Sequence, residues 1–231
     1  MILMAGQPDP DAARRLRCAL VTASIVAIVG AAAFGLVLWS VLAQGGLTGA
    51  DSRVATFVAD HRMAWLTTVM RVVTWLGSLF FIIPLGLAVG GVLWRCRHTW
   101  RPLLMMAAAF LGAAGLYDIV KPAVGRARPP AALQVVGGPD EGWSFPSGHA
   151  TQTIAFYGML AIVLIEWYAP RRRLSFAIGA VVVTLVVGAS RLYLGVHWLT
   201  DVLGGYARGL TWLAVVVIAT QLLRPSGQAR H

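Results

Sequence analysis

The chain has 231 residues, of which 58% are hydrophobic and only 12% are charged, and its formal net charge is +10 at pH 7. A soluble domain carries about twice that charged fraction, and the mean hydropathy of this chain is +0.73. Its apolar residues fall in runs of about twenty or more, the length that crosses a hydrocarbon core of about 30 Å. The composition excludes an ordinary soluble domain and predicts an all-α, polytopic membrane protein.

The positive net charge does not indicate a nucleic-acid partner. The arginines stand in short clusters between the apolar runs, which is where residues that determine membrane topology occur. The two cysteines, Cys18 and Cys96, lie beside such clusters. On the topology derived below both face the reducing side of the membrane, so we expect free thiols and no disulfide.

We divide the chain into a cytoplasmic tail at 1–17, one membrane domain at 18–223 and a second cytoplasmic tail at 224–231. The first apolar run is too long for a signal peptide, whose apolar region has about 7–15 residues. No repeat of fixed period and no second domain is evident. The apolar runs predict six transmembrane helices, at about 18–43, 72–94, 102–120, 149–168, 174–193 and 198–223.

The connection after the first span contains a short amphipathic pattern. Val54, Phe57 and Val58 stand at i, i+3 and i+4 between charged residues. This spacing predicts a short helix lying in the membrane interface, with an ordinary solvated loop as the alternative. In the second span, Gly86 and Gly90 form a pair of small residues suited to close contact with another helix.

The basic residues divide unevenly between the two sides of the membrane. Six spans put both termini on one side, which holds three arginines in the N-terminal tail, three in the second connection, three in the fourth and two in the C-terminal tail. The other side holds fewer basic residues, apart from those in the motifs described next. The positive-inside rule therefore predicts that both termini are cytoplasmic and that the third and fifth connections face outward.

The third connection opens with Lys-Pro-Ala-Val-Gly-Arg-Ala-Arg-Pro, in which Lys121 and Arg128 stand seven apart. Lys121 is the only lysine in the chain, and the other 18 basic residues are arginine. This bias indicates that the position requires a compact ammonium group rather than a planar guanidinium. The alternative is a lysine that only extends its amine from a span end toward the interface.

The third connection closes with Trp-Ser-Phe-Pro-Ser-Gly-His before the fourth span. Ser147, Gly148 and His149 are thus expected at a helix N-terminus, where backbone N–H groups and the helix dipole favour an anion. Gly148 permits close approach of the backbone, Ser147 adds a hydroxyl donor and His149 adds a titratable group. The alternative is that Ser147 simply caps the helix.

The fifth connection contains Arg191, His197 and Asp201. If the segment is helical, His197 and Asp201 lie on one face because they are four residues apart. The carboxylate can then hold one imidazole nitrogen and leave the other to act as base or nucleophile. Arg191 supplies donors suited to a phosphate or carboxylate oxygen. An ordinary polar bridge between His197 and Asp201 is the alternative.

All three clusters fall on the same predicted side of the membrane. Three cations, Lys121, Arg128 and Arg191, would then surround two histidines. So much positive charge favours a bound polyanion and disfavours a divalent metal ion, so we expect no metal site at His197 and Asp201.

Lys-x6-Arg-Pro at Lys121 to Pro129, Pro-Ser-Gly-His at Pro146 to His149, and Ser-Arg-x5-His-x3-Asp at Ser190 to Asp201 resemble a known three-part signature. It is that of the type 2 phosphatidic acid phosphatase superfamily, whose soluble relatives are vanadium haloperoxidases and bacterial acid phosphatases. All three parts match in order without substitution, and the six-span layout resembles the membrane branch of the superfamily.

The resemblance implies a phosphatase that needs no metal or organic cofactor. It implies that His197 attacks phosphorus and forms a phosphohistidine, with Asp201 fixing the imidazole tautomer. His149 would protonate the leaving oxygen and then help to activate water. The groups that would hold the phosphate oxygens are Lys121, Arg128, Arg191, Ser147 and the Gly148 amide.

We therefore expect an integral lipid phosphatase of the cytoplasmic membrane, with its active site on the extracytoplasmic face and with lipid phosphates and membrane lipids as partners. Undecaprenyl or another polyprenyl diphosphate, phosphatidylglycerol phosphate, phosphatidic acid and lipid A phosphates all remain candidate substrates. The preference between mono- and diphosphate and the oligomeric state also remain open. The membrane setting disfavours a haloperoxidase.

A transporter is the alternative from another functional class. It would use the buried charges, including Arg208 and Glu166, as a pathway and would not hydrolyse its substrate. Such a protein is expected to show inverted half-repeats, which the sequence lacks. For Arg208 we expect a structural partner, either Glu166 or a backbone carbonyl, with the lining of a polar cavity beneath the site as the alternative.

Overall fold

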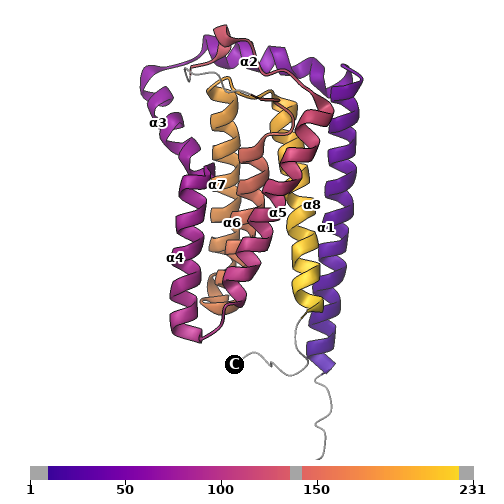
Figure 1. The fold of residues 1–231 in the computed structure, drawn as a ribbon, viewed down its shortest axis with the longest axis vertical. Coiled ribbons are helices and arrows are strands. Elements are labelled where there is room, and N and C mark those ends of the chain that lie inside the picture. The colour runs from indigo at the N-terminus through magenta and orange to yellow at the C-terminus, as the bar shows by residue number, and fades with distance from the viewer. Residues whose placement is uncertain (1–9, 136–141, 224–231) are drawn as a thin grey trace, which may run out of the picture.

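The computed structural model describes residues 10–135 and 142–223, and all regular secondary structure in these residues is helical (Figure 1). The α-helices are α1 (Pro10–Leu42), α2 (Asp51–Asp60), α3 (Ala64–Thr74), α4 (Leu79–Arg97), α5 (Arg101–Val124), α6 (Gly148–Trp167), α7 (Arg173–Tyr193) and α8 (Leu199–Leu222). Short 3-10 helices cover Gly46–Ala50, Trp75–Gly77, Ala131–Leu133 and Pro170–Arg172. Six helices, α1 and α4 to α8, are long and apolar enough to cross a membrane, which confirms the predicted fold class.

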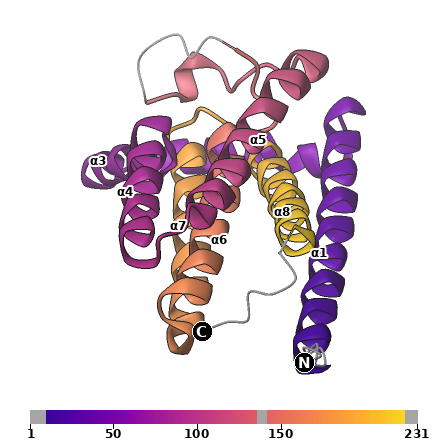
Figure 2. The ribbon, with the colours of Figure 1, turned by 60° about the horizontal axis from the view of Figure 1, so that its bottom comes forward.

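Helix α6 lies at the centre of the bundle, and α5, α7 and α8 pack against it. Helix α1 packs along α8, and α4 packs against α5 at the other side (Figures 1 and 2). The outward faces of these helices carry large apolar side chains, among them Phe80, which is 81% exposed, and Ile119, which is 68% exposed. An exposed apolar surface this extensive requires a lipid environment, because in water it would drive association.

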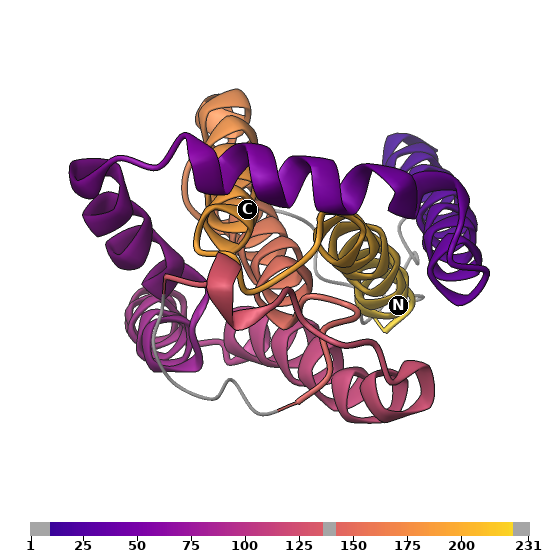
Figure 3. The same cartoon turned by 90° about the horizontal axis from the view of Figure 1, so that it is seen from above.

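Helix α2 lies across one end of the bundle, over α7 and α8 (Figure 3). The predicted short helix is thus present, but its buried face differs from the expected stripe. Val54 and Val58 are half-buried, whereas Phe57 is 62% exposed and Asp51 is only 4% exposed. Positions 51, 54 and 58 share one helix face at spacings of three and four, so the carboxylate points inward with the valines. Its placement in the membrane interface stays a prediction.

The helices that carry the first two predicted spans begin at other residues than those spans. Helix α1 already starts at Pro10, in the expected tail, because proline suits the first turn of a helix and Asp11 complements the helix dipole there. The second span does not start at Val72, since α3 ends at Thr74 and α4 begins only after Ser78, whose backbone is extended. The remaining tail residues, 1–9 and 224–231, lie outside the described residues.

The other four spans match the expected positions more closely. Helices α6, α7 and α8 begin and end within one residue of the predicted limits. Helix α5 continues four residues past its predicted end and stops where Gly125 adopts a left-handed conformation, with φ at +61°. Lys121 therefore stands on the last turn of α5 rather than in the connection.

Glycines allow the helices that carry the site to approach closely. A Cβ atom on Gly205 of α8 would lie 2.7 Å from the backbone oxygen of Ser147, and one on Gly209 would lie 2.8 Å from that of Thr151. Both distances are too short for a side chain, so α8 meets the first turns of α6 backbone to backbone. Gly90 likewise faces Leu103 of α5, in agreement with the small-residue pair predicted on α4.

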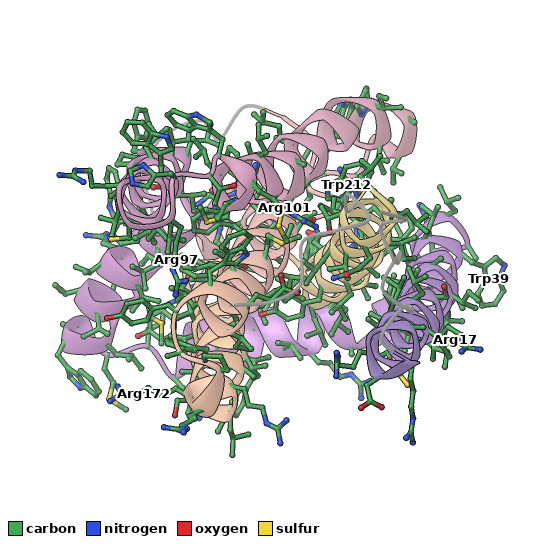
Figure 4. The ribbon with its side chains drawn as sticks, turned by 90° about the horizontal axis from the view of Figure 1, so that it is seen from below. Arg17, Trp39, Arg97, Arg101, Arg172 and Trp212 are labelled. Atoms are coloured by element: carbon green, nitrogen blue, oxygen red, sulfur yellow. The ribbon has the colours of Figure 1, made fainter. Side chains whose placement is uncertain are left out.

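The end of the bundle opposite α2 is rich in arginine (Figure 4). Arg97 donates a hydrogen bond to the Trp167 oxygen at 3.0 Å, and Arg101 donates one to the Thr220 oxygen at 2.7 Å. These contacts join the end of α6 to the end of α4 and the end of α8 to the start of α5. The bundle therefore has one arginine-rich end and one end that is covered by α2 and by the third and fifth connections.

Candidate active site

Backbone hydrogen bonds join the three sequence motifs at the end of the bundle under α2. The Ser144 N–H donates to the Arg126 oxygen at 2.8 Å, which ties the second motif to the first. The Ser147 N–H donates to the Asp201 oxygen at 2.9 Å, which ties the second motif to the third. Segments 18 and 54 residues apart in the chain thus form one continuous structure.

Side chains from the first motif reinforce this junction. Arg128 donates to the Val196 oxygen at 2.8 Å and to the Gly142 oxygen at 3.2 Å. The Trp198 indole N–H donates to the Ala127 oxygen at 2.9 Å. The connection before α8 therefore lies directly against the segment after α5.

The turn after α7 has room for glycine only. Gly195 has φ at +73°, and a Cβ atom there would lie 1.9 Å from the Leu133 oxygen. Arg62 donates to this same Leu133 oxygen at 2.7 Å and to the Tyr193 oxygen at 2.9 Å. The turn is thus fixed between the third connection and the segment after α2, and it delivers His197 to the centre of the junction.

His197 is 3% exposed and lies just before α8, which begins at Leu199. The helical face assumed for His197 and Asp201 is therefore wrong, although the two side chains do meet. His197 Nδ1 lies 3.4 Å from Asp201 Oδ2 and 3.4 Å from Ser144 Oγ. The same Asp201 oxygen accepts hydrogen bonds from the Ser144 hydroxyl and, at 2.8 Å, from the Trp198 N–H.

Burial lowers the pKa of His197 to about 4. Its contact with Asp201 opposes this shift, while the positive charges of Arg191 and Arg128 add to it. The imidazole is therefore neutral at physiological pH. With Nδ1 directed at Asp201, Nε2 is the nitrogen that remains for a substrate.

Three cations surround the histidines. Lys121 is 5% exposed, Arg191 is 8% exposed and Arg128 is half-buried. These three residues and His197 lie close enough to His149 to interact with it electrostatically. Buried positive charge of this density is favourable only beside anions, so the arrangement suits a phosphate.

Other contacts fix two of these side chains in place. Thr74, at the end of α3, accepts a hydrogen bond from Arg191 at 3.0 Å. Gly77 leaves space for His149, because a Cβ atom at position 77 would lie 2.9 Å from His149 Cδ2. The break between α3 and α4, which falls inside the span predicted at 72–94, thus contributes directly to the site.

Ser147 and Gly148 stand at the start of α6, as predicted. The Ser147 hydroxyl makes no capping hydrogen bond, so the alternative of a simple helix cap is wrong. This Oγ atom is buried and makes no hydrogen bond within the described residues. A buried hydroxyl at a helix N-terminus is a donor suited to an anionic ligand.

Four residues at the site were not identified from the sequence: Asp51, Arg126, Ser144 and Thr200. Arg126 forms ion pairs with Asp51 and Asp201, and Ser144 contacts both His197 and Asp201. The pattern that places Asp51 on one helix face with Val54 and Val58 could have indicated its burial. For Ser144 and Thr200, no local pattern distinguishes them from ordinary loop and helix-start residues.

Arg208 has the structural partner that was expected, because it donates to the Ala113 oxygen at 2.9 Å. It also borders a cavity of about 150 Å³ with Phe34, Thr211 and Trp212.

In residues 10–135 and 142–223, no group of three or more His, Cys, Asp or Glu side chains is placed to hold a metal ion.

Comparisons with known proteins agree with this geometry. The family model described as "PAP2 superfamily" matches residues 98–225. The chain is 33% identical over 180 residues to phosphatidylglycerophosphatase B of Bacillus subtilis, covering 77% of this chain and 86% of that protein. It is 31% identical over 108 residues to lipid A 1-phosphatase of Rhizobium johnstonii, covering 44% of this chain and 40% of that protein.

A solved structure is also similar. It is the crystal structure of a transmembrane PAP2-type phosphatidylglycerolphosphate phosphatase from Bacillus subtilis. Its TM-score to this chain is 0.78 at 30% sequence identity, and the match covers 86% of this chain and 98% of that one.

The depressed pKa of His197 predicts a stability that depends on pH. Its folded-state pKa of about 4 lies below the unfolded value of about 6.5. The stability that the folded protein gains from a neutral His197 is therefore complete above about pH 6.5 and is lost as pH falls toward about 4. Between pH 7 and 4.5, the melting temperature of the purified protein should fall more steeply for the wild type than for His197→Gln. Parallel curves for the two proteins would contradict the assigned pKa.

Proposed function

The chain belongs to the PAP2 superfamily and is a membrane lipid phosphatase, and from this premise we propose that it hydrolyses its substrate through a phosphohistidine on His197. The observation that carries the proposal is a buried, neutral imidazole held by Asp201 among three cations. A neutral imidazole has the lone pair that attack on phosphorus requires.

In the first step, His197 Nε2 attacks the phosphorus atom of the substrate. The N–P bond forms while the P–O bond to the lipid breaks, and Asp201 stabilises the positive charge that develops on the imidazole. His149 donates a proton to the departing lipid oxygen. The products of this step are the free lipid alcohol, or the lipid monophosphate from a diphosphate, and the phosphorylated histidine.

In the second step, water hydrolyses the phosphohistidine. His149, now without its proton, accepts one from the attacking water, and the N–P bond breaks as inorganic phosphate leaves. His197 returns to its neutral form. This cycle balances without a metal ion or an organic cofactor.

Lys121, Arg128, Arg191, the Ser147 hydroxyl and the Gly148 N–H hold the phosphate oxygens. Two of these groups are held in place before the substrate binds, because Arg128 donates to the Val196 and Gly142 oxygens and Arg191 donates to Thr74. Such fixed donors stabilise the transition state, in which negative charge spreads over the equatorial oxygens of phosphorus.

A lipid phosphate with its headgroup at the membrane surface is the substrate class that fits a site at the end of a membrane bundle. Phosphatidylglycerol phosphate is the first candidate, since the relative that matches 77% of this chain and the solved structure that matches 86% of it are named for it. The transporter alternative loses its support, because the reported relatives are named as phosphatases. We place both termini in the cytoplasm and the site on the outer face, as the distribution of arginine predicts.

A substrate panel tests this function. The purified protein, assayed in EDTA, should release phosphate from phosphatidylglycerol phosphate faster than from phosphatidic acid, polyprenyl diphosphate, a lipid A phosphate or a water-soluble ester. His197→Ala should lower kcat by at least about 10³-fold, since it removes the nucleophile. His149→Ala should lower it by about 10²- to 10⁴-fold, the usual contribution of general acid–base catalysis.

Colorimetric detection of phosphate is the measurement, and Asp60→Asn, an exposed change on α2, is the control that should keep wild-type activity. Loss of phosphate release in EDTA with recovery on adding a divalent metal would overturn the metal-free cycle. Full activity of His197→Ala would overturn the assignment of the nucleophile.

The proposed orientation can be tested with the natural thiols. Cys18 and Cys96 are both exposed and free, and both lie toward the arginine-rich end. A membrane-impermeant maleimide applied to intact cells should leave the wild type unlabelled and should label Asp60→Cys, at the other end of the bundle. Labelling of the wild type, with no further labelling when Asp60→Cys is introduced, would reverse the orientation, and permeabilised cells provide the control for reactivity.

A further inference from the structure

The two oxygens of the Asp201 carboxylate face different partners. Oδ2 lies toward His197, Ser144 and the Trp198 N–H. Oδ1 instead accepts a hydrogen bond from Arg126 at 2.7 Å. Because Asp201 is fully buried, Arg126 is its ionic partner on the side away from the histidine.

A second buried carboxylate lies behind Arg126. Asp51 Oδ2 pairs with the guanidinium and accepts from the Thr200 hydroxyl at 2.7 Å, while Oδ1 accepts from the Thr200 N–H at 2.9 Å. The Thr200 hydroxyl in turn accepts from Arg126 at 2.6 Å. A carboxylate from α2 thus satisfies an amide in the first turn of α8, where the helix dipole favours negative charge.

The charges of Arg126 and Arg128 act on different residues. Arg126 acts on Asp201, whereas Arg128 acts on the two histidines. Both terminal nitrogens of Arg126 contact the carboxylates, and its Cζ atom lies 5.8 Å from the centre of the Trp198 ring. Arg128, by contrast, donates to the backbone oxygens of Val196 and Gly142.

Charge balance requires a cation between the two carboxylates. Asp51 is 4% exposed and Asp201 is fully buried, and two buried acids without a counter-ion cannot both stay ionised. If Asp201 were protonated, it would accept a weaker hydrogen bond from His197 Nδ1. It would also fail to balance the positive charge that forms on the imidazole during attack.

We propose that Arg126, anchored by Asp51 and Thr200, is a positioning residue that keeps Asp201 ionised and directed at His197, and that it thereby couples α2 to the nucleophile. The proposal rests on the proposed function, because it assumes that His197 attacks phosphorus. It predicts an effect on the chemical step and little effect on substrate binding.

Steady-state kinetics of the full-length protein with phosphatidylglycerol phosphate test the proposal. Arg126→Gln should lower kcat by about 10- to 100-fold, the usual cost of losing a partner of a catalytic group, with KM within about twofold of the wild type. Arg126→Lys should recover part of the loss because the charge returns. Asp51→Asn should lower kcat less than Arg126→Gln does, because Arg126 can still pair with Asp201.

Two control variants separate this role from others. Arg128→Lys should raise KM, because it alters a phosphate contact, while Asp60→Asn at the other end of α2 should match the wild type. The acid limb of the kcat profile should move to higher pH in Arg126→Gln, because Asp201 then takes up a proton more readily. A merely structural role of Arg126 would lower the amount of folded enzyme and leave the pH profile in place.

Three results would overturn the proposal: a raised KM with wild-type kcat in Arg126→Gln, an unchanged pH profile, or wild-type kcat in both Arg126→Gln and Asp51→Asn. If Arg126→Gln does not fold, Arg126→Lys and Asp51→Asn carry the same comparison. Failure of the proposed function gives a different pattern, in which His197→Ala retains activity or the wild type releases no phosphate.

Discussion

The structure depends on one buried carboxylate, that of Asp201. It accepts hydrogen bonds from the Ser144 hydroxyl, from Arg126 and from the Trp198 N–H, and it lies against His197. These donors come from all three motif segments, so a single side chain fixes the start of α8, the segment before α6 and the segment after α5 relative to one another. The Asp201 carboxylate that orients the nucleophile therefore also holds the third and fifth connections together.

Close helix packing makes this convergence possible. The first turns of α6 approach the second and third turns of α8 backbone to backbone at Gly205 and Gly209, and the Ser147 N–H reaches the Asp201 oxygen. In a lipid environment, van der Waals contact and satisfied polar groups drive helix association, because lipid offers no hydrophobic gain. The hydrogen bonds between the motifs thus contribute both to the fold and to the geometry of the site.

The sequence predicted the fold class because apolar length alone identifies a membrane span. It predicted α6 to α8 closely because a glycine or an arginine cluster, or the motif itself, bounds each one. The start of α4 was missed because the apolar run continues across Gly77 and Ser78, whereas Gly77 packs against His149 and Val187 and the backbone of Ser78 is extended. Asp51 and Arg126 were missed as site residues because their partners are 75 to 149 residues away in the chain, a separation that no local pattern encodes.

The most direct test of the central claim is to isolate the covalent intermediate. The protein is mixed with a lipid whose terminal phosphate is radiolabelled, quenched in alkali within milliseconds and digested. The label should be found on the peptide that contains His197, stable in base and lost in acid, as expected for an N–P bond, and it should be absent from His197→Ala. Turnover without any labelled peptide, or label on a different residue, would contradict the account.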